Sequence, residues 1–127
     1  MSALVLDAGA LIAVDRDDRA MMARLRIAQL HGYDLRTCAM VVAQVWRSPT
    51  GRQARLAAFL KAVDVRAIDE RMGREAGVLQ AKAGTDDPID ATVVLIARPG
   101  DRILTSDLED LEQLVSSCGK GVVVVRC

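Results

Sequence analysis

The chain has 127 residues, about half of them apolar, and its 17 basic and 17 acidic residues give no net charge. A chain of this length buries roughly two-thirds of its surface on folding, so we expect one compact domain over residues 1–127. Its longest apolar runs are far shorter than the ~18 residues of a membrane span, and no export signal precedes them, so we expect no membrane association and a cytoplasmic protein.

Charge is unevenly distributed along the chain. Residues 47–82 hold eight basic and four acidic side chains, whereas residues 84–112 hold eight acidic and two basic ones. The basic segment is either a solvated face or a surface for nucleic acid, and composition leaves both alternatives open. Three cysteines without CxxC spacing argue against a disulfide framework and against a zinc site.

Short apolar runs alternate with helical patterns, and Pro49 and Gly51 mark a loop between two of them. We expect strands at 3–6, 35–40, 65–68, 102–105 and 122–125. The valines of the last strand are typical of burial on both faces. We expect helices at 8–14, 18–30, 41–47, 54–63, 69–83, 89–97 and 107–117, the helix at 89–97 almost wholly buried. This alternation predicts an α/β fold of three layers, α/β/α, with a central parallel sheet of about five strands.

Three aspartates belong to elements that should meet at one edge of this sheet. Asp7 ends the first strand, Asp107 follows the fourth, and Asp90 lies near the start of a helix whose amino end faces the same edge. Each alone could be a helix cap. Together, ionised carboxylates repel unless a cation lies between them, and oxygen ligands suit Mg²⁺ or Mn²⁺. The chemistry that this arrangement predicts is metal-assisted phosphodiester hydrolysis.

Four segments cover the ends of these elements: LVLDAGALIA from Leu4, VVAQVWR from Val41, DPIDATVVLIA from Asp87 and ILTSDLEDL from Ile103. Together they resemble the PIN-domain ribonucleases, and especially the VapC toxins of bacterial toxin–antitoxin pairs, over nearly the whole chain. The resemblance implies a PIN-like fold, a Mg²⁺- or Mn²⁺-dependent endoribonuclease and a homodimer. It also implies inhibition by a VapB-type antitoxin whose C-terminal tail enters the active site.

The same resemblance assigns the site residues. It implies that Asp7, Asp90 and Asp107 bind the metal and that Thr105 and Ser106 form the polar pair beside the last acid. Gln44 stands where the family usually has Glu. We keep Gln44 among the catalytic candidates, either as a weaker metal ligand or as a hydrogen bonder to the ligands. Nearby acids that could compensate or support the site are Asp86, Asp87 and Asp110.

Two functions therefore remain open from the sequence. The chain is either an active toxin nuclease or a catalytically weakened PIN-fold module that binds a protein partner or RNA without cleaving. The few aromatic residues disfavour extended base stacking, so we expect Arg47, Arg52 and Arg55 to line the route of RNA phosphates. His31 stands alone at an expected loop, which disfavours a nucleophile–histidine pair, and Trp46 is better interpreted as a packing or interface residue.

Overall fold

The computed structural model describes residues 2–48 and 51–127, so the loop residue Pro49 lies outside the described residues. Within these ranges, five strands form one parallel sheet in the order β3-β2-β1-β4-β5. The strands are β1 (Ala3–Leu6), β2 (Asp34–Cys38), β3 (Asp64–Arg66), β4 (Arg102–Thr105) and β5 (Val123–Arg126). Each begins and ends within two residues of its predicted bounds, and the predicted parallel sheet is confirmed.

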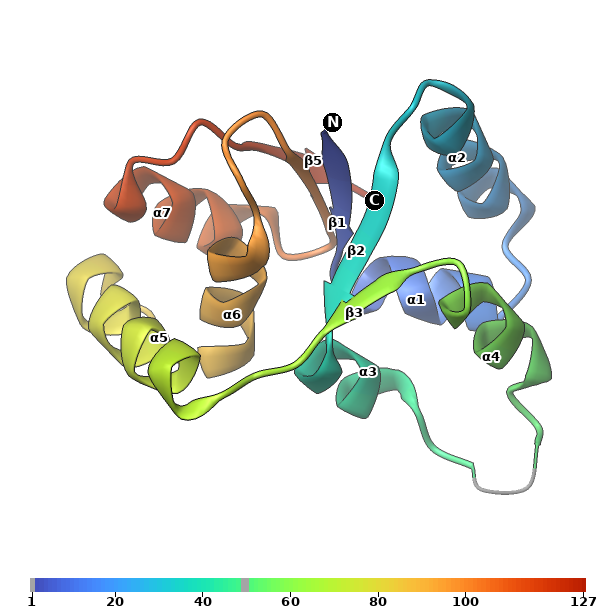
Figure 1. Cartoon of the computed structure of the whole chain (residues 1–127), viewed down its shortest axis with the longest axis horizontal. Helices are drawn as coiled ribbons and strands as arrows, with labels where there is room; N and C mark the ends of the chain where they lie inside the picture. The colour runs from blue at the N-terminus through green and yellow to red at the C-terminus, as the bar shows by residue number, and fades with distance from the viewer. Residues whose placement is uncertain (1, 49–50) are drawn as a thin grey trace.

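Helices cover both faces of the sheet, as predicted for a three-layer α/β fold (Figure 1). The helices on one side are α1 (Ala8–Asp15), α2 (Arg19–Leu30) and α4 (Ala54–Leu60). The helices on the other side are α5 (Glu70–Ala83), α6 (Pro88–Ile96) and α7 (Leu108–Cys118). A further short helix, α3 (Ala39–Val45), follows the carboxyl end of β2. In the described ranges, no helix has the length and apolarity needed to cross a bilayer.

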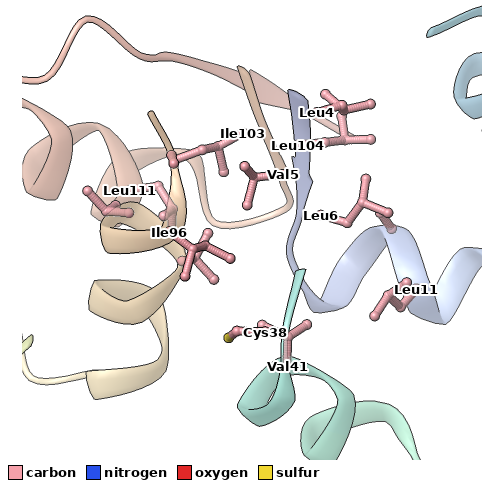
Figure 2. Close-up of a cluster of buried hydrophobic side chains, with 14 of the residues drawn as sticks. Leu4, Val5, Leu6, Leu11, Cys38, Val41, Ile96, Ile103, Leu104 and Leu111 are labelled. Atoms are coloured by element: carbon pink, nitrogen blue, oxygen red, sulfur yellow. The ribbon is translucent and has the colours of Figure 1, made fainter. Parts of the chain in front are cut away.

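The core fills both faces of the central strands, because successive strand residues point to opposite sides. In Figure 2, Leu6 of β1 points toward Leu11 of α1, whereas Val5 and Ile103 point toward the side of α7, where Leu111 lies. All five side chains are fully buried. The almost complete burial predicted for the helix at 89–97 is confirmed, because α6 lies against the sheet with most of its residues buried.

The burial predicted for both faces of the last strand is wrong. β5 forms an edge of the sheet beside β4, and its first residue, Val123, is 58% exposed. A run of valines favours an extended backbone, but it carries no information about the position of a strand within a sheet. That position is decided by the connection through α7, which brings β5 outside β4.

A buried ion pair that the sequence did not predict holds the amino ends of the central strands. Arg36 of β2 donates through Nη1 to Asp101 Oδ2 at 2.9 Å, and both residues are at most 5% exposed. Asp101 also accepts hydrogen bonds from the backbone N–H groups of Ala3 and Arg98, each at 2.8 Å. The two buried charges of Arg36 and Asp101 are therefore paired and hydrogen-bonded.

Candidate metal centre

The strand order reverses between β1 and β4, which defines the place in a parallel sheet where ligands bind. From β1 the chain builds outward to β2 and β3 on one side, and β4 and β5 extend the sheet on the other. Asp7 follows β1 directly, and Asp107 lies two residues after the end of β4. The fold therefore brings these two predicted residues to the same crevice.

Asp7 has a structural role in addition to any functional one. Its Oδ1 accepts the backbone N–H of Ala8 at 2.8 Å, so it caps α1. Its Oδ2 accepts the hydroxyl of Thr105 at 2.7 Å, and Asp7 is only 5% exposed. Both carboxylate oxygens of Asp7 thus have a hydrogen-bond donor from the protein.

Thr105 connects Asp7 to the start of α7. This fully buried residue donates to Asp7 and accepts the backbone N–H of Asp107 at 2.9 Å. The predicted polar neighbour of the last acid is therefore placed beside it. Ser106, the other half of the pair, is exposed, and its Oγ would lie 2.9 Å from a Cβ atom built at Gly9. Gly9 thus leaves room for the turn that carries Asp107.

Asp107 is the N-cap residue of α7, yet its side chain does not cap the helix. Asp18, Asp69 and Asp87 cap their helices by accepting the N–H groups of Met21, Met72 and Ile89. The carboxylate of Asp107 makes no such bond to the described residues. Capping therefore explains Asp87, and partly Asp7, but leaves the carboxylate of Asp107 without an explanation in helix stability.

Three carboxylates converge at this edge. One carboxylate oxygen each from Asp90, Asp107 and Asp110 lies within 4.8 Å of the other two. Asp110 was expected as an acid that could compensate for Gln44 or support the site, and its position beside Asp107 agrees with their three-residue spacing at the start of α7. Asp7 is not part of this group of oxygens, although its charge acts on Asp90.

Asp90 is the most unusual member of this cluster. It is 5% exposed, and its Oδ2 has no hydrogen-bond partner among the described residues. Burial raises the pKa of Asp90 from 3.8 to about 8, with further contributions from contact with the Asp107 carboxyl and from the charge of Asp7. A helix amino end is worth only ~0.3–1 kcal/mol to a carboxylate, so the position of Asp90 in the first turn of α6 cannot offset this desolvation.

Gln44 carries a second buried oxygen without a partner. It lies on α3, which follows β2, and its Oε1 has no hydrogen-bond partner in the described part of the chain. Buried oxygens of this kind usually bind a water or a cation. The cluster at the switch point contains carboxylates, one of them with an oxygen that has no partner among the described residues, and it contains no His or Cys. Oxygen ligands of this kind bind hard divalent cations, so the residues fit Mg²⁺ or Mn²⁺.

The predicted RNA-contacting arginines differ in their surroundings. Arg47 donates to the carbonyls of Ala43 and Trp46, so its guanidinium covers the end of α3. Arg55 donates to the carbonyl of Asp15 and lies 3.6 Å from a carboxylate oxygen of Asp17. Arg52 is exposed. Their role in RNA binding stays a prediction; all three are exposed, and Arg47 and Arg55 already have partners among the described residues.

His31 and Trp46 are placed outside the carboxylate cluster. His31 is exposed at the end of α2, with Nδ1 2.8 Å from the carbonyl of Ile27. Trp46 follows α3 directly and is 37% exposed. Neither residue therefore enlarges the candidate site.

No family model and no curated protein matches the sequence. The three-layer α/β architecture is nevertheless that of a known structure. The chain is similar to one in the crystal structure of VapBC2 from Rickettsia felis bound to a DNA fragment from their promoter, with a TM-score of 0.71, 10% identity and 98% of each chain covered. The likeness confirms the fold that the sequence resemblance predicted.

Proposed function

We propose that this chain is a Mg²⁺- or Mn²⁺-dependent endoribonuclease that hydrolyses RNA phosphodiester bonds and acts as the toxin of a toxin–antitoxin pair. The observation that carries the proposal is the position of Asp90. This residue is buried, its Oδ2 has no hydrogen-bond partner among the described residues, and it lies beside two other carboxylates at the switch point of the sheet. Burying one carboxylate beside two others is unfavourable unless a cation or a hydrogen-bond donor compensates its charge.

Asp7, Asp90 and Asp107 are the residues that we expect to hold the ion. A divalent ion bound there supplies activation of a water and neutralisation of charge on the phosphate oxygens. Thr105 fixes the carboxylate of Asp7 and the first N–H of the turn into α7 with one hydroxyl group. Burial and the neighbouring carboxylates raise the pKa of Asp90 to about 8, which favours its uncharged form at neutral pH, and an ion held there would need its charged form.

The partners are proposed from the likeness of fold. The similar solved structure is a VapBC2 complex bound to promoter DNA. This supports a VapB-type antitoxin as the protein partner of the present chain. RNA as the substrate, a homodimer as the assembly and the cytoplasm as its location follow from the sequence resemblance and belong to the same proposal.

One observation favours a second function. Gln44 has no charge at the position where the PIN-domain ribonucleases usually have Glu. A full negative charge at ~4 Å from a bound cation contributes several kcal/mol of gross attraction at an effective dielectric of ~20. A site weakened by this loss would leave a module that binds its partner or RNA without cleaving. We rank it second because Asp7, Asp90 and Asp107 are all present.

Purified protein incubated with total RNA, with and without Mn²⁺ or Mg²⁺, separates the two functions. Discrete fragments should form only with the metal, and Asp107→Asn should form none because it removes a proposed metal ligand. The variant should still fold, since the side chain of Asp107 makes no cap bond to α7. Glu112→Gln, an exposed change on the same helix, is the matched control and should cleave like the wild type. Metal-independent cleavage, or the same fragments from Asp107→Asn, would contradict a nuclease built on this site.

The toxin role has its own test, which is growth after expression of the chain alone. Wild-type expression should arrest growth, and Asp7→Asn should relieve the arrest at an equal level of folded protein. Equal growth with both proteins would favour the binding module.

A further inference from the structure

Asp110 lies inside the carboxylate cluster, whereas the sequence left open whether Asp86, Asp87 or Asp110 compensates for Gln44. Its oxygen is within 4.8 Å of oxygens of both Asp90 and Asp107. Building on the proposed metal site, we infer that Asp110 is a direct ligand of the divalent ion. In this role it supplies the negative charge that Gln44 lacks.

The cluster alone would not carry this inference, since acidic groups often gather at surfaces without binding ions. The independent observation is Asp90, which is 95% buried and has an Oδ2 atom without a hydrogen-bond partner among the described residues. A carboxylate buried this deeply normally finds donors in the protein. A cation between Asp90, Asp107 and Asp110 provides the missing partner.

The hydrogen bonds of Asp7 and Asp110 differ in a way that favours Asp110. Both oxygens of Asp7 accept hydrogen bonds, from the N–H of Ala8 and from the hydroxyl of Thr105. The carboxylate of Asp110 makes no hydrogen bond or ion pair within residues 2–48 and 51–127. Its oxygens are therefore available for an ion, whereas Asp7 already uses an acceptor position on each oxygen.

The largest charge effects on Asp110 within the described residues come from other acidic residues. The charge of Asp107 raises the pKa of Asp110, and Glu109, Asp86 and Asp87 act in the same direction. No basic residue is among the largest causes of this shift. In the metal-free protein the charge of Asp110 is therefore repelled by its neighbours. A carboxylate that forms a structural ion pair would instead lie beside a basic residue.

The test is Mn²⁺ binding by the full chain, measured by calorimetry in Asp110→Asn and in the matched control Glu112→Gln. Loss of a residue that only orients a ligand typically costs 10–100-fold in affinity, so Asp110→Asn should weaken Mn²⁺ binding about tenfold or more. Glu112 is exposed on the same helix, and its change should alter affinity less than about twofold. Asp110→Ser provides a second variant if the first does not fold.

Thermal unfolding gives a readout that a merely structural role would not reproduce. Without metal, Asp110→Asn should melt at no lower temperature than the wild type, because the substitution removes a charge that its neighbours repel. Added Mn²⁺ should raise the melting temperature of the wild type by more than it raises that of Asp110→Asn. Wild-type affinity in both Asp110 variants overturns the inference and leaves the nuclease proposal standing. Absence of Mn²⁺ binding in the wild type overturns both the inference and the proposed metal-dependent function.

Discussion

Asp90 is a carboxyl group whose helix position and burial act in opposite directions. The amino end of α6 favours its charge, but desolvation dominates and raises the pKa from 3.8 to about 8. The folded state consequently binds more protons than the unfolded state between these two values. Stability contributed by the protonated group is thus complete below pH ~4 and is lost as the pH rises through ~8.

This linkage predicts a difference between the wild type and Asp90→Asn in metal-free buffer. The free energy of unfolding of the wild type should fall relative to the variant between pH ~5 and ~8, because Asn cannot ionise. Each unit of pKa shift that is realised in solution corresponds to ~1.4 kcal/mol. Denaturant unfolding at several pH values measures the difference, and parallel curves for the two proteins would show that the shift is absent.

Gln44 gives a second prediction at the scale of a single residue. Its Oε1 is buried without a partner, so an acid at this position would add a charge with little change in shape. Gln44→Glu should therefore tighten Mn²⁺ binding about tenfold, since a new charge in the site adds at least ~1.4 kcal/mol of attraction. Calorimetry of both proteins at one pH measures this, and an unchanged or weaker affinity would count against Gln44 as a ligand.

Among the elements, those with local signals were predictable. Asp18 and Asp69 cap their helices, and Gly84 ends α5 with a φ of +73°, a conformation that glycine adopts without strain. These choices are made by a few neighbouring residues, so the sequence displays them. The bounds of the strands were recovered for the same reason.

Features that depend on distant residues were not predictable in this way. The prediction that β5 is buried on both faces was wrong, because the edge position of a strand depends on the order of the whole sheet. Arg36 looks like a solvated residue until it meets Asp101, which lies 65 residues away in the chain. Asp7, Asp90 and Asp107 were assigned by their motifs, but the inclusion of Asp110 depends on how α7 is rotated against α6.

Lys120 is a further residue whose role depends on distant residues, in this case those at the end of a helix. The sequence indicates only a turn at Gly119 and Gly121, but the Lys120 ammonium donates to the carbonyls of Val94, Leu95 and Ala97 at 2.9–3.1 Å. These carbonyls end α6, whose other end carries Asp90. Lys120 therefore satisfies the last turn of the helix that positions the buried acid.

Lys120→Met should lower the free energy of unfolding by ~1–3 kcal/mol, because hydrogen bonds from a charged group are lost and half-buried carbonyls remain unpaired. Lys82→Met is the matched control: Lys82 is exposed in the last turn of α5, and its change should stay within ~0.5 kcal/mol. Urea unfolding of the three proteins compares them. Equal losses in both variants would assign the effect to general charge rather than to the end of α6.

The whole molecule has two chemically different ends of its sheet. At the amino ends of the strands, Arg36 and Asp101 neutralise each other in the interior. At the carboxyl ends, Asp90, Asp107 and Asp110 meet without a basic partner among the groups that shift the pKa values of Asp90 and Asp110. The buried acid at the amino ends is thus paired with a base, whereas the buried acid at the carboxyl ends lies beside other acids. An anionic substrate needs a cation at that end and basic side chains outside it.

The segment at 47–82 holds eight of the 17 basic side chains of the chain, and Arg52 is an exposed member of the predicted set. RNA that contacts Arg52 through a phosphate releases counterions, so Arg52→Gln should reduce the slope of log affinity against log salt by ~0.7 for a single strand. Arg55→Gln should reduce it less, because Arg55 already contacts Asp15 and Asp17.

Binding of a single-stranded oligonucleotide with EDTA present, measured over a range of salt concentrations, gives these slopes without cleavage. Arg71→Gln is the control, since Arg71 is exposed on α5 and pairs with Glu75. A slope that changes equally in Arg52→Gln and Arg71→Gln would indicate attraction by net charge alone. A slope that changes only in Arg52→Gln would place the RNA backbone along the segment between α3 and α4.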